Sequence, residues 1–123
     1  MILIAGGPRT GKTTLGHKLA TETGLQLRST DDLIGKLEWS AASEAVSFWF
    51  DESPAVIEGV AVGRALRKWF KRSTANLDAE VYYLGTPKVP LVGRQVQMAN
   101  ECAKVWREIL PELKARNARI VEL

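Results

Sequence analysis

The chain has 123 residues, of which 46% are hydrophobic and 25% charged, and its formal net charge at pH 7 is +3. This length leaves room for one domain with a stable core, and the composition is that of an ordinary water-soluble globular protein rather than a disordered or fibrous one. No apolar run approaches the ~20 residues of a membrane span, and Cys102 has no partner for an internal disulfide. We therefore expect a single domain over residues 1–123, in the reducing cytoplasm and without membrane association.

The first quarter of the chain predicts a strand, a helix and a second strand. MILIA at residues 1–5 is apolar throughout, as in a buried strand, and it is too short for a signal peptide. Residues 12–23 have the apolar spacing of a helix, which we expect to end before Gly24. In LQLRS at residues 25–29, apolar and polar residues alternate, which predicts a short strand.

The middle of the chain continues the alternation. Residues 31–50 predict helix in two pieces, split near residues 39–42. PAVIEG at residues 54–59 predicts a buried strand that Pro54 opens. Residues 61–73 then predict an amphipathic helix with one apolar face.

The last part of the chain predicts two more strands around a long helix. Residues 79–85 predict the fourth strand, and the two prolines in residues 86–93 predict a loop. The long helix that follows contains Pro111, where we expect a kink or a restart. ARIVEL at residues 118–123 predicts the fifth strand. Strands separated by helices imply crossover connections and a parallel sheet covered on both faces.

A glycine-rich loop follows the first strand directly. Gly6, Gly11, Lys12 and Thr13 fit the pattern G-x-x-x-x-G-K-[ST], with a strand before it and a helix after it. Glycines let the backbone turn so that successive N–H groups point at a phosphate, the lysine adds charge for the β and γ phosphates, and the threonine hydroxyl suits Mg²⁺. We therefore expect ATP and Mg²⁺ to bind here. The residues expected to hold the nucleotide are Gly6, Gly7, Pro8, Arg9, Thr10, Gly11, Lys12, Thr13 and Thr14.

Two carboxylates follow the second strand in RSTDDL. The carboxyl ends of parallel strands share one edge of the sheet, so Asp31 is expected beside the phosphate loop, where it would bind the substrate hydroxyl and accept its proton. A structural interpretation competes with this one. Ser29 and Asp32 have the spacing of a helix capping box, and we assign Asp32 to that role.

Four segments in this order resemble those of P-loop kinases of the nucleoside and nucleotide kinase-like group, which includes polynucleotide 5′-kinase-like and zeta-toxin-like phosphotransferases. They are GGPRTGKTT, STDDL, VIEG and a late arginine-bearing segment. The resemblance implies a three-layer α/β P-loop NTPase-type fold with a five-stranded parallel sheet of order 2-3-1-4-5. It also implies transfer of the γ-phosphoryl group of ATP to a small molecule such as a nucleoside or nucleotide. The polynucleotide kinase pattern has an arginine three residues after the first acid, where this chain has Ile34.

Three further residues complete the predicted site. Glu58 ends the third strand, where P-loop proteins often carry an acid that holds Mg²⁺ through water, although any polar strand end suits this position. Arg64, at the start of the next helix, resembles a substrate-binding arginine, although a solvent-exposed helix residue suits this position as well. We expect residues 86–94 to form a short mobile lid in which Arg94 stabilises the transferring phosphoryl group, with Lys88 as a weaker substitute. The alternative is that Arg94 only begins the long helix and faces solvent.

Other functions stay open from the sequence. Residues 64–72 are rich in arginine and lysine and include two aromatic residues, which permits nucleic-acid binding, but the spacing is that of an ordinary amphipathic helix. The alternative to a phosphotransferase is a nucleotide-binding regulatory module with little or no transfer activity, for which the shortness of the lid is the argument. A GTPase is the least favoured alternative, because the chain has no Asn-Lys-x-Asp guanine motif.

Overall fold

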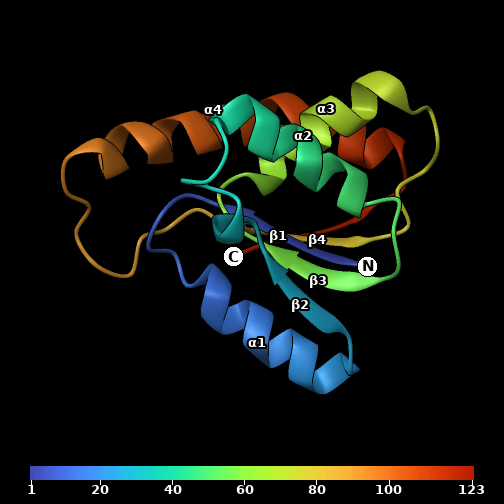
Figure 1. Ribbon diagram of the computed structural model, residues 1–123, viewed down its shortest axis with the longest axis horizontal. Coiled ribbons are helices and arrows are strands. Elements are labelled where there is room, and N and C mark those ends of the chain that lie inside the picture. The colour runs from blue at the N-terminus through green and yellow to red at the C-terminus, as the bar shows by residue number, and fades with distance from the viewer.

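The computed structural model describes all 123 residues and has the α/β architecture that the sequence predicts (Figure 1). Five parallel strands form one sheet in the order β2-β3-β1-β4-β5, which confirms the order implied by the resemblance. The strands are β1 (Ile2–Gly6), β2 (Gln26–Ser29), β3 (Ala55–Glu58), β4 (Glu80–Leu84) and β5 (Arg119–Glu122). The helices are α1 (Lys12–Thr23), α2 (Trp39–Trp49), α3 (Val62–Arg72) and α4 (Arg94–Ala115), with a 3-10 turn at Thr30–Asp32.

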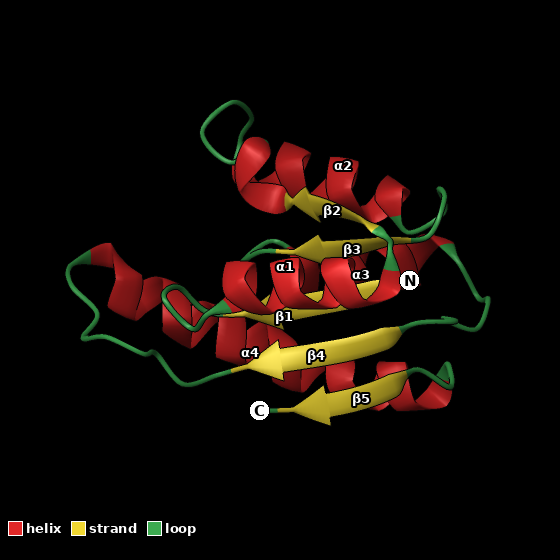
Figure 2. Ribbon diagram, turned by 90° about the horizontal axis from the view of Figure 1, so that it is seen from below, coloured by secondary structure: helices red, strands yellow, loops and turns green.

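The helices cover the two faces of the sheet unequally. One face carries α2, α3 and α4, and the other carries α1 alone (Figure 1). Seen from the α1 side, β4 and β5 have no helix in front of them (Figure 2). The two hydrophobic cores differ in size accordingly. The core between the sheet and α2, α3 and α4 contains 17 buried residues, and the core on the α1 side contains four.

The central strand brings the site together. β1 lies between β3 and β4, with Ile4 paired in register to Glu58 and Gly6 to Leu84. The loops that leave the carboxyl ends of these three strands therefore start side by side. This is the position at which open parallel sheets bind ligands.

The predicted helical region at residues 31–50 is interrupted earlier than expected. Residues 33–38 separate the 3-10 turn from α2, so the prediction of a break near residues 39–42 is wrong by several positions. Gly35 takes a left-handed conformation, with φ 91°, which a continuous helix cannot contain. An isolated bridge between Ile34 and Leu37 stabilises the resulting turn.

The long helix α4 continues through Pro111 to Ala115, so the predicted restart at this residue does not occur. A proline inside a helix costs about 3 kcal/mol because it removes a hydrogen bond and crowds the preceding turn. Ile109 and Leu113 flank Pro111 and are 2% and 0% exposed. Burying two such side chains contributes about 1.5–3 kcal/mol each, which is enough to hold the helix together.

Candidate functional site

The loop between β1 and α1 has the shape that phosphate binding requires. Gly6 has φ 152°, and a Cβ there would lie 2.2 Å from the carbonyl oxygen of Leu84. Gly11 has φ 91° and precedes the first turn of α1. The amides of Arg9, Thr10 and Gly11 donate no hydrogen bond to another protein group. The loop therefore offers several free N–H donors, beside the positive end of α1, to one anion.

Lys12 extends back along this loop. Its ammonium group donates hydrogen bonds to the carbonyl oxygen of Gly7 and, at 3.4 Å, to the hydroxyl of Thr10. Burial lowers the pKa of Lys12 below its ordinary value of 10.5, against the opposing effect of Glu58 and Asp31. No carboxylate forms an ion pair with Lys12. A buried cation without an ion-pair partner favours an anionic ligand.

Glu58 lies opposite the loop and is 1% exposed. Its Oε1 accepts a hydrogen bond from the Thr13 hydroxyl at 3.3 Å, whereas its buried Oε2 has no hydrogen-bond partner. A buried carboxylate oxygen is rarely left without a partner, because its desolvation is then uncompensated. A hydroxyl and a carboxylate oxygen side by side are donors of the type that Mg²⁺ prefers, so these residues fit this cation. No group of three or more His, Cys, Asp or Glu side chains forms a metal site elsewhere.

A groove of about 340 Å³ connects these residues to Asp31. Asp31 lies in the 3-10 turn after β2, where its amide donates to the Ser29 hydroxyl at 3.3 Å. Ser29 therefore caps the 3-10 turn through Asp31 and not through Asp32, and the Asp32 side chain makes no hydrogen bond, so the predicted capping box of Ser29 and Asp32 does not form. The groove is lined by Pro8, Arg9, Thr10, Gly11, Lys12, Thr13, Thr14, Asp31, Ile34, Glu58, Val60 and Met98.

A second pocket, of about 510 Å³, opens on the other side of the phosphate loop. It shares Thr10, Gly11 and Thr14 with the groove, so one extended ligand on the loop has room in both directions. The other residues that line it are Leu15, Lys18, Leu84, Thr86, Pro87, Lys88 and Leu123. Sequence reasoning missed this pocket, because it forms between α1 and two strand ends that are distant in the chain.

The two predicted arginines lie outside both pockets. Arg64 forms a 3.0 Å ion pair with Glu101 of α4, and its guanidinium lies 5.0 Å from the centre of the Trp39 ring. Arg94 is exposed at the first residue of α4, which extends past the ends of the strands (Figure 2). Neither side chain lines the groove that holds Asp31 and Lys12. Their roles in substrate binding and transfer stay predictions.

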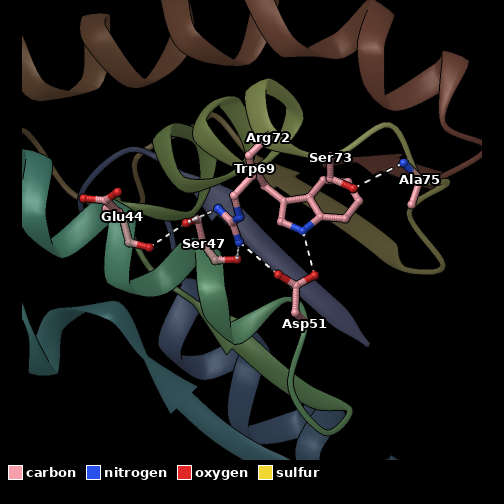
Figure 3. Close-up of polar contacts among 7 residues, drawn as sticks. All are labelled: Glu44, Ser47, Asp51, Trp69, Arg72, Ser73 and Ala75. Carbon is pink, nitrogen blue, oxygen red and sulfur yellow. Dashed lines mark hydrogen bonds and ion pairs between the residues drawn. The ribbon is translucent and has the colours of Figure 1, made fainter.

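Most basic residues of the α3 segment at 64–72 make polar contacts within the fold. Arg72 donates to the hydroxyl and carbonyl oxygens of Ser47 and to Asp51, which also accepts a 2.9 Å hydrogen bond from the Trp69 indole (Figure 3). Arg67 pairs with Glu108 at 3.0 Å. These contacts tie α3 to α2 and α4, as expected for the amphipathic helix.

Comparisons with known proteins show the fold. No family model matches the chain, and no curated protein matches it. A shikimate kinase from Acinetobacter baumannii, solved in complex with shikimate, has a TM-score of 0.58 at 16% identity over 99% of this chain and 81% of its own. Shikimate kinase from Bacteroides thetaiotaomicron has a TM-score of 0.50 at 12% identity, over 97% and 83% respectively. The chain shares the fold of these two solved shikimate kinases.

The fold carries no candidate for a membrane-spanning segment. None of its helices combines the length and the apolar character needed to cross a bilayer.

Proposed function

We propose that the protein is an ATP- and Mg²⁺-dependent phosphotransferase that moves the γ-phosphoryl group to a hydroxyl or phosphate of a small molecule such as a nucleoside or nucleotide. The observation that carries this proposal is the unpartnered Oε2 of Glu58 beside the Thr13 hydroxyl. These two oxygens share one groove with Lys12 and Asp31. Buried carboxylate oxygens with a purely structural role are normally hydrogen-bonded, so the free Oε2 supports a ligand at this place.

Each group in the groove has a chemical role in this reaction. The loop amides and Lys12 bind the phosphates, while Thr13 and Glu58 hold the cation. Mg²⁺ bound there would neutralise charge on the phosphates. An acceptor oxygen bonds to the γ-phosphorus as the bond to the β–γ bridging oxygen breaks. The acceptor proton passes to the Asp31 carboxylate, and ADP leaves.

The acceptor side of the groove combines Asp31 with the apolar side chains of Ile34, Val60 and Met98. This lining suits a compact hydroxyl compound with an apolar surface. The shikimate kinases of similar fold make shikimate one compound to test. A polynucleotide 5′-hydroxyl is less well supported, since the arginines of residues 64–72 pair with carboxylates of the same chain.

The proposal is tested by nucleotide binding and turnover. Calorimetry with Mg-ATP should show binding that Lys12→Ala weakens by roughly 1.5–3 kcal/mol, the scale of charge-assisted hydrogen bonds. Lys114→Ala, which removes an exposed lysine at the far end of α4, is the matched control. ATP turnover is then measured with nucleosides, nucleotides, shikimate and 5′-hydroxyl oligonucleotides. Equal affinity of wild type and Lys12→Ala would refute the phosphate site.

A nucleotide-binding module without transfer activity is the second candidate. The observation in its favour is the segment between β4 and α4, residues 85–93, which contains no helix that would form a larger lid. This candidate predicts Mg-ATP binding with no acceptor-dependent turnover for any compound of the panel.

A further inference from the structure

Arginine side chains differ in their availability to a ligand. Six of the nine arginines form ion pairs with carboxylates of the same chain. The three others are Arg9, Arg94 and Arg107. Of these, Arg9 lines the groove that contains Lys12, Asp31 and Glu58. Its guanidinium makes no hydrogen bond, ion pair or ring contact, so it retains all five donors for a ligand.

The backbone at Arg9 has a conformation that a glycine would adopt more easily. Its φ of 59° lies in the left-handed region, where a side chain is disfavoured. The carbonyl oxygen of Arg9 accepts a 2.8 Å hydrogen bond from the amide of Lys88, which helps to hold this conformation. The loop therefore carries a side chain at a stability cost. Strain of this kind concentrates at functional sites.

We propose that the Arg9 guanidinium is a catalytic group that binds the phosphoryl group during its transfer, a role that rests on the function proposed above. As the acceptor oxygen bonds to the γ-phosphorus and the bond to the leaving ADP oxygen breaks, negative charge spreads over the equatorial oxygens. A planar guanidinium binds two such oxygens at once, whereas an ammonium group acts as a point charge.

The positions of the other cations support this assignment. Arg64 is paired with Glu101, and Arg94 lies outside the groove. Lys12 contacts the Gly7 carbonyl and belongs to the phosphate-binding part of the loop. Arg9 is the arginine that the fold places in the same groove as the proposed base, Asp31.

The test compares Arg9→Gly, Arg9→Ala and Arg9→Lys with wild type, with Arg107→Ala as the control for loss of an unpaired arginine. Mg-ADP affinity is measured with and without aluminium fluoride, which mimics the transferring phosphoryl group, and Mg-ATP hydrolysis is measured without an added acceptor. Arg9→Gly and Arg9→Ala should lose about 10²–10³-fold in hydrolysis rate and in aluminium fluoride complex formation. Their affinity for Mg-ADP alone should change less than about threefold. Arg9→Lys should retain more activity than either.

Thermal unfolding separates this role from a structural one. Arg9→Gly relieves the left-handed strain and should melt about 2–6 °C above Arg9→Ala, although both variants lack the guanidinium. A folded Arg9→Gly protein with wild-type hydrolysis and aluminium fluoride binding would overturn the proposal and leave the phosphotransferase function standing. An equal loss of affinity for Mg-ADP alone would also overturn it, because Arg9 would then bind the ground state. A wild-type protein that binds no nucleotide would refute both the role of Arg9 and the proposed phosphotransferase function.

Discussion

The backbone amide of Lys88 donates a hydrogen bond to the carbonyl oxygen of Arg9 at 2.8 Å, which joins the loop after β4 to the phosphate loop. The Lys88 side chain passes so close to Gly11 that a Cβ added to the glycine would lie 2.7 Å from Cε of the lysine. The predicted loop at residues 86–93 is thus confirmed. The backbone hydrogen bond of Lys88 attaches this loop to the phosphate loop. Its closure over a ligand stays a prediction.

Lys88→Ala should weaken Mg-ATP binding about three- to tenfold, because it removes an ammonium group beside the phosphate loop without removing the amide that bonds to Arg9. The effect should shrink with added salt, since Lys88 is exposed to solvent. Calorimetry at two ionic strengths measures both effects. Lys114→Ala serves again as the matched control, and equal losses in the two variants would assign the effect to net charge alone.

Glu58→Gln should raise the Mg²⁺ concentration that gives half-maximal nucleotide-dependent turnover by about 10- to 100-fold, the usual scale for groups that position a metal ion. The amide oxygen can still accept the hydrogen bond from Thr13, so the packing around β3 is preserved while the charge is removed. A Mg²⁺ titration of wild type, Glu58→Gln and the exposed control Glu22→Gln measures the effect. An unchanged titration curve would leave Glu58 with a structural role only.

Asp31→Asn should lower acceptor-dependent turnover by about 10²–10⁴-fold if the carboxylate is the general base, with little change in ATP affinity. The amide has the same shape but does not accept the proton at neutral pH. Asp32→Asn is the adjacent control, because Asp32 lines neither pocket at the loop. A larger loss in Asp32→Asn than in Asp31→Asn would reverse the assignment of roles.

The lowered pKa of Lys12 makes stability depend on alkaline pH. Burial favours the neutral amine in the folded state. At pH values between the folded-state pKa and the ordinary value of 10.5, the unfolded chain therefore binds more protons than the folded protein does. The free energy of unfolding should therefore rise with pH in this window, relative to a Lys12→Met variant that lacks the group. Urea unfolding of both proteins from neutral pH upward gives the difference. A difference that falls as pH rises would show that the folded-state pKa of Lys12 is raised.

Asp51→Ala should lower the free energy of unfolding by about 1–2 kcal/mol, because it removes the acceptor for both the Trp69 indole and Arg72. These contacts lie at the C-terminal end of α2 (Figure 3). Neither pocket at the phosphate loop is lined by Asp51, Trp69 or Arg72. Mg-ATP affinity should therefore be unchanged. Urea unfolding and calorimetry test both parts, with the exposed Asp78→Ala as the control. Equal stability of the two variants would contradict the proposed contribution of Asp51.

Local patterns in the sequence were sufficient for most of the helices and strands and for the phosphate loop, but not for the break before α2 or the continuity of α4. Gly24 ends α1 with φ 73°, and its amide bonds to the carbonyl of Ala20 as in a helix C-cap. Residues 6–14 comprise the end of β1, the glycine-rich loop and the first turn of α1, as the motif predicts. Such features depend on interactions between residues that are only a few positions apart. The positions of glycine and proline and the spacing of apolar residues therefore predict them.

The tertiary structure decided which side chains share the groove. The sequence alone predicted Arg64 and Arg94 as site residues, yet Arg64 pairs with Glu101 of α4 and Arg94 lies outside the groove. Met98 enters the groove because α4 crosses the sheet edge, a placement that no motif signals. These outcomes depend on packing and ion pairing between segments more than thirty residues apart, and local sequence patterns carry no information about those long-range contacts.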